Sequence, residues 1–230
     1  YPDFKYVVQK AGEMPVAKMF NILIAWKKNH NVELLVGANL DYLALNKSFA
    51  KLTKPKQKAV LNFIRENSEG EYCGKGSIEK ENTADEVVHQ DSIFTRKGTE
   101  RIIRYAYEYA KANNMTRVLS ATKSNALNHS MVFWDKIFDE VRAEYPEMES
   151  SQMHIDALAG YFIMHPERLD VVVASNLFGD ILSDEASMVT GSIGMLASAS
   201  LNDTKFGLYE PSHGSAPDIA GLDVANPIAT

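Results

Sequence analysis

The chain has 230 residues, of which 45% are hydrophobic and 23% are charged. This balance is typical of a folded globular protein and excludes an intrinsically disordered chain. The formal net charge of −6 argues against a nucleic-acid or anionic-membrane partner, since either would require a basic excess. A single cysteine permits neither an internal disulfide nor a cysteine-cluster metal site, as is usual in a reducing compartment. We therefore expect a cytoplasmic protein whose partner is a small molecule.

The longest nearly apolar run covers residues 16–26 and is shorter than the about 20 residues that a membrane-spanning helix needs. We therefore expect no membrane partner. The chain begins with Tyr1 rather than Met and ends at Thr230, shortly after an Asn-Pro pair. We expect from this a fragment that is truncated at both ends.

Short apolar runs alternate along the chain with stretches of helical periodicity, as in an α/β protein. Residues 87–94 form a further short run, which we expect to make a hairpin arm with the region around Tyr72. Residues 157–164 are apolar, whereas the proline- and glycine-rich stretch 210–218 fits neither a helix nor a strand. The predicted helices cover residues 15–28, 39–52, 99–112 and 130–143, with Ser130 as a cap, and the predicted strands cover residues 32–36, 59–64, 117–120 and 171–173.

Two carboxylates follow the apolar run Val171–Val173. This run is β-branched and apolar on both faces, which predicts a buried strand of a mostly parallel sheet. Asn176 and Gly179 predict a turn, after which a helix begins at Asp180. Asp180 and Asp184 are then i and i+4 on one helix face, where their repulsion would be relieved by a bound cation. Carboxylate oxygens are preferred ligands of Mg²⁺ and Mn²⁺.

An ordinary helix cap at Asp180 and an exposed charge at Asp184 remain the alternative, because Asp is common at helix starts. The position of the pair just past the carboxyl end of a strand favours a ligand site, since open α/β sheets bind their ligands there. Asp156, which precedes the apolar segment 157–164, would be a third carboxylate for the cation.

Arg65 and Tyr72 follow the predicted strand 59–64. An arginine at a strand end can bind a carboxylate with two parallel hydrogen bonds. The phenol of Tyr72 could donate a proton if a nearby cation lowers its pKa. A polar turn with a half-buried tyrosine is an equally good interpretation of the same residues.

Lys123 follows the predicted strand 117–120, in a polar run that includes Asn125. Burial or a neighbouring cation could lower the pKa of this lysine and make it a base near neutral pH. A surface lysine is the alternative.

The loop Glu210–Asp218 is rich in small residues and hydrogen-bond donors. His213 could stack on an adenine, Gly214 permits close backbone approach, and Asp218 could accept from both hydroxyls of a ribose. The Asp218 carboxylate would repel a 2′-phosphate, which favours NAD over NADP. An ordinary surface loop is the alternative, and the chain contains no GxGxxG fingerprint.

Five segments, in this order along the chain, resemble those of the β-decarboxylating dehydrogenases, the family of isopropylmalate, isocitrate, homoisocitrate, tartrate and D-malate dehydrogenases. The tartrate/D-malate branch is the most similar, on SATKSN, the pair Trp134-Asp135 and FTRKGTER. The resemblance implies an α/β fold like that of isopropylmalate dehydrogenase, with mixed sheets flanked by helices and a dimer-forming arm. The five segments are RENSEGEY (65–72), SATKSN (120–125), HIDAL (154–158), VVVASNLFGDILSD (171–184) and EPSHGSAPDIAG (210–221).

The resemblance also implies a role for individual residues. Asp180 and Asp184 of one subunit and Asp156 of its dimer partner would bind Mg²⁺ or Mn²⁺. Lys123 would take the substrate hydroxyl proton through a water, and Tyr72 would protonate the enol after CO₂ departs. The remaining implied roles are a substrate-carboxylate clamp at Arg65, a nicotinamide neighbour at Asn125, and cofactor contacts at His213, Gly214, Ser215, Ala216, Pro217, Asp218, Ile219 and Asn226.

The resemblance also implies a division of the chain into three regions. Residues 1–64 form a diverged segment, either part of the cofactor-side domain or rearranged, that lacks the family's opening glycine turn and additional substrate arginines. Residues 65–185 form the substrate, metal and dimerisation domain, and residues 186–230 return into a truncated cofactor domain. We expect an NAD- and metal-dependent dehydrogenase that acts on a small 2-hydroxy diacid such as D-malate or tartrate. An inactive dimer-forming fragment or pseudoenzyme of the same family, or isopropylmalate or isocitrate as the substrate, is the alternative.

Overall fold

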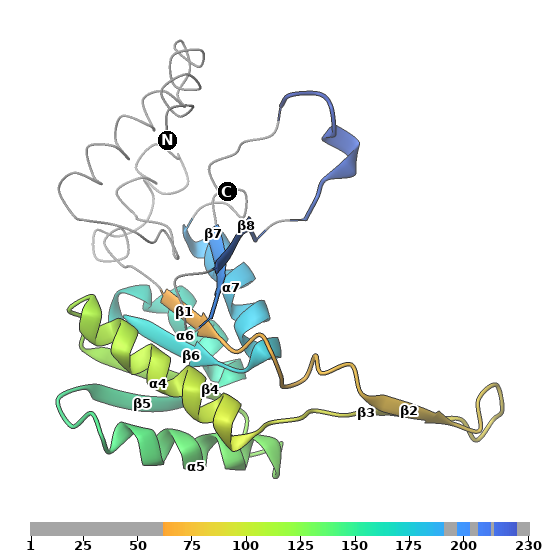
Figure 1. Ribbon diagram of the computed structural model, residues 1–230, viewed down its shortest axis with the longest axis horizontal. Coiled ribbons are helices and arrows are strands. Elements are labelled where there is room, and N and C mark those ends of the chain that lie inside the picture. Colours follow the sequence, from red (N-terminus) through yellow and green to blue (C-terminus); the bar gives the residue numbers. More distant parts are fainter. Residues whose placement is uncertain (1–61, 191–196, 203–206, 213, 225–230) are drawn as a thin grey trace.

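The structure, a computed structural model, describes residues 62–190, 197–202, 207–212 and 214–224. Its centre is a four-stranded parallel sheet with the strand order β1–β6–β4–β5 (Figure 1). The predictions for residues 15–28, 32–36 and 39–52 lie outside the described residues. The four strands are β1 (Asn62–Arg65), β4 (Arg117–Thr122), β5 (Glu149–His154) and β6 (Val171–Ala174).

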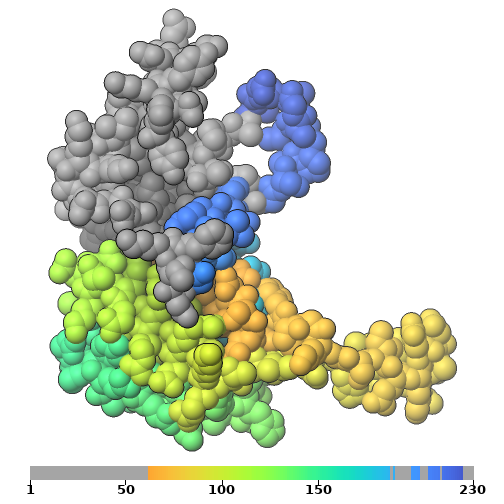
Figure 2. All heavy atoms as spheres, in the orientation of Figure 1, coloured from red at the N-terminus to blue at the C-terminus, as the bar shows by residue number. Residues whose placement is uncertain are grey.

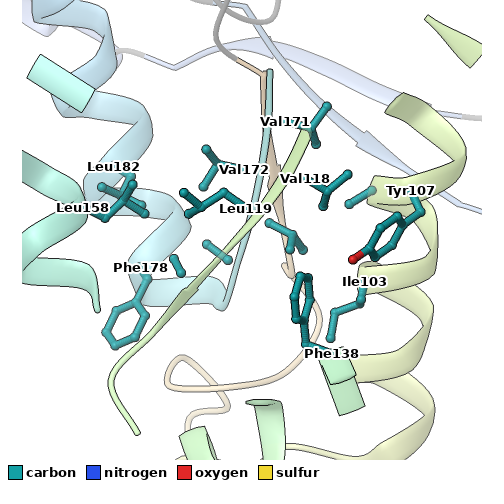
Figure 3. Packing of buried hydrophobic residues seen from close by; sticks show 14 of the residues in the cluster. Ile103, Tyr107, Val118, Leu119, Phe138, Leu158, Val171, Val172, Phe178 and Leu182 are labelled. Carbon is teal, nitrogen blue, oxygen red and sulfur yellow. The ribbon is translucent and has the colours of Figure 1, made fainter. Parts of the chain in front are cut away.

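Two layers of helices cover the sheet. Helices α4 (Arg96–Ala112) and α5 (Ser130–Arg142) pack on one face, and α6 (Ile155–Met164) and α7 (Asn176–Thr190) pack on the other. The α/β fold predicted from the sequence is therefore confirmed. Figure 3 shows apolar side chains reaching the strands from both sides, with Leu158, Phe178 and Leu182 on one side and Ile103, Tyr107 and Phe138 on the other.

Parallel strands covered on both faces must be apolar throughout, and β6 meets this condition because all four of its residues are buried. Trp134 of α5 is fully buried, and its indole N–H donates to Ser120 Oγ at 2.8 Å. Burial of one such large side chain stabilises the fold by roughly 1.5–3 kcal/mol. The aromatics of α5 belong to the core, as their helical spacing predicts.

A two-stranded antiparallel hairpin projects from this body. Strands β2 (Gly76–Glu79) and β3 (Val87–Gln90) are exposed along their whole length. Figure 2 shows the hairpin standing clear of the sheet and helices. At its base, Gly70 and Ile93 exchange backbone hydrogen bonds of 2.7 and 3.1 Å. The predicted hairpin arm is confirmed.

The C-terminal part differs from prediction in two places. Strands β7 (Ala197–Leu201) and β8 (Gly207–Pro211) form an antiparallel pair, so the start of the loop 210–218 belongs to a strand. Pro211 is tolerated because it is the last residue of its strand, where no ladder N–H is required. Pro217–Ile219 forms a single 3₁₀ turn, η5, where no helix was predicted. A second short turn, η3 (Pro166–Arg168), connects α6 to β6.

Two helix starts and one strand of the main sheet also differ from prediction. Helix α4 begins at Arg96, because the Thr95 hydroxyl accepts a hydrogen bond of 3.0 Å from the Gly98 N–H. Ser130 is the first residue of α5 and not its cap, since the cap position belongs to His129. Strand β5 was not predicted, because its sequence ESSQMH is polar and lies at the edge of the described sheet. Within the described residues, no helix is both long and apolar enough to cross a membrane.

Candidate active site

Helix α7 begins at Asn176 and not at Asp180. The Gly179 N–H donates to the Ser175 carbonyl at 2.8 Å, which makes Ser175 the cap residue and leaves Asn176 and Gly179 inside the helix. The predicted turn at Asn176 and Gly179 is therefore wrong, and so is the interpretation of Asp180 as a helix cap. Asp180 and Asp184 do share this helix at i and i+4, as predicted.

Arg65, Tyr72 and Asp180 form one connected cluster. Arg65 Nε and Nη2 donate to Asn176 Oδ1 at 3.0 and 2.7 Å, and Arg65 Nη1 is ion-paired with Asp180 Oδ1. The Tyr72 hydroxyl donates to Asp180 Oδ2 at 3.1 Å, and the Arg65 guanidinium lies 5.8 Å from the centre of the Tyr72 ring. The end of β1 and the second turn of α7 are thereby joined by charge-assisted hydrogen bonds.

Gly179 permits this close approach of α7 to β1. A Cβ atom at this position would lie 2.7 Å from both Cβ and Cγ of Arg65, which is closer than van der Waals contact allows. The glycine predicted as a turn residue is therefore required for a different reason, the passage of the Arg65 stem beside the helix.

The surroundings of Tyr72 raise its pKa above the ordinary value. The causes are partial desolvation of the phenol, the hydrogen bond to Asp180 and the negative charge of Asp180, opposed by the positive charge of Arg65. From the sequence, Tyr72 was predicted to donate a proton if a nearby cation lowered its pKa. The side chains around Tyr72 have the opposite net effect on this pKa. With a raised pKa, the phenol keeps its proton at neutral pH and can donate it.

Lys123 and Asp156 form a second cluster at the ends of the neighbouring strands β4 and β5. Lys123 Nζ lies 2.7 Å from Asp156 Oδ1, and the lysine side chain is only 24% exposed. The hydrogen bond from Lys123 and those from the backbone of Asp156 hold the pKa of the Asp156 carboxyl below its ordinary value. Lys123 is thus partly covered and ion-paired, and its assignment as a base stays a prediction.

The two clusters lie at the same edge of the sheet. The strands are parallel, so the residues that follow β1, β6, β4 and β5 all emerge at the carboxyl edge. The three predicted metal ligands are nevertheless divided between the clusters: Asp180 and Asp184 belong to α7, and Asp156 is paired with Lys123. Among the described residues, no three His, Cys, Asp or Glu side chains converge on a point where they could hold a metal ion. One chain thus carries two carboxylates on α7 and a separate third carboxylate at the start of α6, and carboxylate oxygens are the donors that hard divalent cations prefer.

The predicted cofactor residues lie in exposed segments. Asn125 is exposed in the turn that follows β4, where Ala126 N–H and Leu127 N–H donate to the Lys123 carbonyl. A pocket of about 570 Å³ opens beside this turn and is lined by Ser92, Phe94, residues 126–130 and Phe133. Ala216 has a positive φ of 43° and precedes η5. Gly214, Ser215, Ala216, Pro217 and Asp218 are exposed, Ile219 is half-buried, and His213 and Asn226 lie outside the described residues.

The three glutamates of residues 65–72 have roles that sequence reasoning did not find. Glu66 is 1% exposed and accepts from Arg101 Nη2 at 3.0 and 2.9 Å. Glu69 accepts from the Thr95 N–H and hydroxyl, both at 2.8 Å. Glu71 accepts from the Ser175 hydroxyl at 2.6 Å and the Leu177 N–H at 3.1 Å. Each partner is distant in the sequence, so no local pattern could have revealed these contacts. The signal available was the density of carboxylates beside one arginine.

Comparison with known proteins shows the family to which this chain belongs. The family model described as "Isocitrate/isopropylmalate dehydrogenase" matches residues 30–230. The D-malate dehydrogenase [decarboxylating] of Escherichia coli (strain K12) is 51% identical over 179 residues, which cover 76% of this chain and 50% of that protein. The tartrate dehydrogenase/decarboxylase of Pseudomonas putida is 52% identical over 169 residues, which cover 72% of this chain and 46% of that protein.

A solved structure agrees with these sequence relatives. The crystal structure of isocitrate dehydrogenase from Methylococcus capsulatus superposes with a TM-score of 0.70 at 40% identity and covers 75% of this chain and 51% of that one. The chain spans about half the length of the curated relatives it matches. The family match, these identities and the shared fold agree, and the chain belongs to the isocitrate/isopropylmalate dehydrogenase family.

Proposed function

We propose that two copies of this chain form an NAD-dependent dehydrogenase that oxidises and decarboxylates a small 2-hydroxy diacid with the help of Mg²⁺ or Mn²⁺. The observation that carries the proposal is the pair of clusters, Arg65–Tyr72–Asp180 and Lys123–Asp156, at the carboxyl edge of one parallel sheet. This edge is where open α/β sheets bind their ligands.

The carboxylates of Asp180 and Asp184, together with Asp156 of a second copy, would hold the divalent cation. When bound, such a cation supplies Lewis-acid polarisation of an alcohol or carbonyl oxygen. In the structure, the charge of Asp180 is balanced by its ion pair with Arg65. A divalent cation at Asp180 would balance that charge instead, and the Arg65 guanidinium would then be available to bind a substrate carboxylate.

The remaining groups move the protons. Lys123 would accept the hydroxyl proton of the substrate through a water, and NAD⁺, when bound, would supply the acceptor for the hydride of the same carbon. The resulting 2-oxo acid loses CO₂, and the Tyr72 phenol, which keeps its proton at neutral pH, would protonate the enol carbon. The products are a 2-oxo acid, CO₂ and NADH. Asn125 would lie near the nicotinamide, and residues 213–219 with Asn226 would contact the adenosine side.

Two exposed apolar surfaces support the proposal of a homodimer. Ile163 and Met164 of α6 and Ile181 of α7 are each about half exposed, and both helices lie on the same face of the sheet. Ile78, Val87 and Val88 are exposed on the hairpin arm. Exposed apolar side chains of this size are common at protein interfaces, and a second copy would cover them and bring Asp156 to the Asp180 pair.

D-malate and tartrate are the favoured substrates, because relatives at 51% and 52% identity carry those names. A screen of NADH formation with D-malate, tartrate, isopropylmalate and isocitrate tests this, in the presence of Mn²⁺ or Mg²⁺. Turnover of isopropylmalate or isocitrate alone would overturn the substrate assignment while leaving the reaction class intact.

A catalytically silent, dimer-forming member of the family is the second candidate. It is favoured by one observation, the absence of a glycine turn and of additional arginines before Arg65 in the sequence. Tight Mn²⁺ binding without NADH formation from any hydroxy diacid would support this candidate, and measurable turnover would exclude it.

A further inference from the structure

Glu71 occupies an unusual place for a glutamate, at the first turn of a helix that begins far from it in the sequence. The first N–H groups of a helix lack partners within the helix and are usually satisfied by the side chain of the cap residue. In α7 the cap residue Ser175 does not do this, because its hydroxyl donates to Glu71 Oε1 at 2.6 Å. The Leu177 N–H donates instead to Glu71 Oε2 at 3.1 Å, from a residue 106 positions away. The carboxylate also lies at the positive end of the helix dipole, where a negative charge is stabilised.

The contacts of Glu71 join two segments that carry the candidate active site. Tyr72 follows Glu71 directly in the chain, and α7 carries both Asn176, which accepts from Arg65, and Asp180, which accepts from Tyr72. A third hydrogen bond, from Asn176 Nδ2 to the Glu69 carbonyl at 3.1 Å, connects the same two segments. The segment 69–72 is therefore held against α7 by the two bonds of Glu71, the one bond of Asn176 and the bond from Tyr72 to Asp180.

We propose that Glu71 is a positioning residue, whose carboxylate fixes the Tyr72 phenol relative to Asp180 and Arg65. The inference rests on the proposed function for its catalytic meaning, although the positioning itself is a property of the free protein. Without the Glu71 carboxylate, the described hydrogen bonds between residues 69–72 and α7 are those of Asn176 and of the Tyr72 hydroxyl itself, so the backbone beside Tyr72 no longer fixes the phenol relative to Asp180. Misplacement of a reacting group by about 1 Å can cost about 100-fold in rate.

Glu69 is a matched control on the same turn. The Glu69 carboxylate accepts hydrogen bonds from the Thr95 N–H and hydroxyl. It thus supplies acceptors at the start of α4, much as Glu71 does at the start of α7. Both side chains are half-buried. Among the described residues, the Glu69 carboxylate makes its hydrogen bonds to Thr95 and none to α7, and the Glu69 backbone carbonyl, which accepts from Asn176, is retained in a substitution. A loss of stability that is common to the Glu69 and Glu71 variants therefore reports a structural role. A change at Tyr72 that occurs only in the Glu71 variants reports positioning of the phenol.

The experiment compares Glu71→Ala, Glu71→Gln and Glu69→Ala in the full chain. The first readout is hydrogen exchange of the Leu177 amide, and the second is the ¹⁹F resonance of 3-fluorotyrosine placed at position 72. The third is the steady-state kinetics with D-malate or tartrate. In Glu71→Ala we expect Leu177 to exchange about 2- to 30-fold faster, as for loss of a helix cap, and the fluorine resonance to shift or broaden. We expect kcat/KM to fall about 10- to 100-fold. Glu71→Gln, which keeps one carbonyl oxygen, should recover part of each effect, and Glu69→Ala should leave the fluorine resonance unchanged and the kinetics within about twofold.

Two results would overturn the proposal. One is an unchanged fluorine resonance in Glu71→Ala despite faster exchange at Leu177, and the other is an equal change in the Glu71 and Glu69 variants. If the wild-type chain produces no NADH, the proposed function fails, but exchange and fluorine spectra still decide whether Glu71 positions Tyr72. If Glu71→Ala does not fold, Ser175→Ala, which removes one of the two side-chain bonds, takes its place with the same expected directions.

Discussion

Lys123 Nζ lies 2.7 Å from Asp156 Oδ1, so the ammonium group that follows β4 and the carboxylate at the start of α6 form an ion pair within one chain. If Lys123 is the base of the proposed reaction, Lys123→Met should lower kcat by about 10²- to 10⁴-fold, the usual contribution of general base catalysis. The melting temperature should change little, because Asp156 remains well exposed to water. Lys111→Met removes an ion pair with Glu147 on the far end of α4 and should change neither quantity. Full activity in Lys123→Met would remove this lysine from the mechanism.

Metal ligation by Asp156, Asp180 and Asp184 can be tested without turnover. A ligand of the folded state stabilises it by RT ln(1 + [L]/Kd), about 2.7 kcal/mol at a hundred times Kd. Mn²⁺ should therefore raise the melting temperature of the wild type, and Asp180→Asn, Asp184→Asn and Asp156→Asn should each lose most of that rise. Asp139→Asn, at an exposed ion pair on α5, should keep it. The mechanism would be left without its cation if all three variants kept the full Mn²⁺-induced rise.

Gly179→Ala tests the close passage of Arg65 beside α7. The added Cβ would lie 2.7 Å from the Arg65 stem, so either the helix or the arginine must shift. Such overpacking costs about 1–3 kcal/mol of unfolding free energy, and we expect KM for the diacid to rise because the guanidinium moves. Ser183→Ala, on the next turn of the same helix, adds no atom and should leave KM unchanged. Urea unfolding and initial-rate kinetics measure the two effects, and a neutral Gly179→Ala would contradict the geometry.

Asp170 should make stability depend on pH. Partial burial raises the pKa of this carboxyl, but hydrogen bonds from Arg117 and from the Thr116 N–H outweigh burial and lower it overall. A folded-state pKa below the unfolded value of about 3.9 stabilises the protein above that pH, and the stabilisation is lost as the pH falls through the folded-state pKa. Asp170→Asn should therefore cost about 1–3 kcal/mol at pH 7, and the difference from wild type should shrink below about pH 4. Urea titrations at pH 7 and pH 3 measure the unfolding free energies of both proteins. If the difference between variant and wild type were the same at both pH values, the charge of Asp170 would not be the source of its stabilising effect.

If the proposed dimer forms through α7, a charged substitution on the exposed side of this helix should prevent dimerisation. Ile181 is half exposed on this helix, and Ile181→Glu would place a charge in the contact with a second copy. We expect the variant to sediment as a monomer and to lose turnover, since Asp156 could no longer reach the Asp180 pair. Val132→Glu introduces the same change at a similarly exposed position of α5, on the opposite face of the sheet, and should remain dimeric and active. A wild-type chain that is monomeric at micromolar concentration yet active would contradict the shared site.

Sequence patterns identified the features that depend on nearby residues. The run Val171–Val173 is buried on both faces because it lies in a covered parallel sheet, and its composition alone predicted this. The shared helix of Asp180 and Asp184 likewise follows from local periodicity. Strand β5 was missed because its polar residues ESSQMH lack the apolar alternation that marks a half-buried strand.

The features that could not be predicted depend on partners distant in the sequence. Arg65 and Asp180 are 115 positions apart, and only the pairing of β1 with β6 brings them together. The start of α7 was placed too late for the same reason, because Glu71 supplies the acceptor that its first turn needs. Local rules consider capping side chains next to the helix start and cannot detect an acceptor supplied from a turn that is distant in the sequence.

The strand order also determines when the candidate active site can assemble. In the described sheet, β1 pairs with β6 alone, so the strand that carries Arg65 finds its neighbour only after the intervening arm, helices and strands have been synthesised. Contacts of such long sequence separation close late, because the entropy of the large loop is lost before the pairing compensates for it. A nascent chain that ends before α7 can form β4, α5 and β5 but has no partner for Arg65. We therefore expect the edge that carries the candidate active site to be among the last parts of the described fold to become ordered during synthesis.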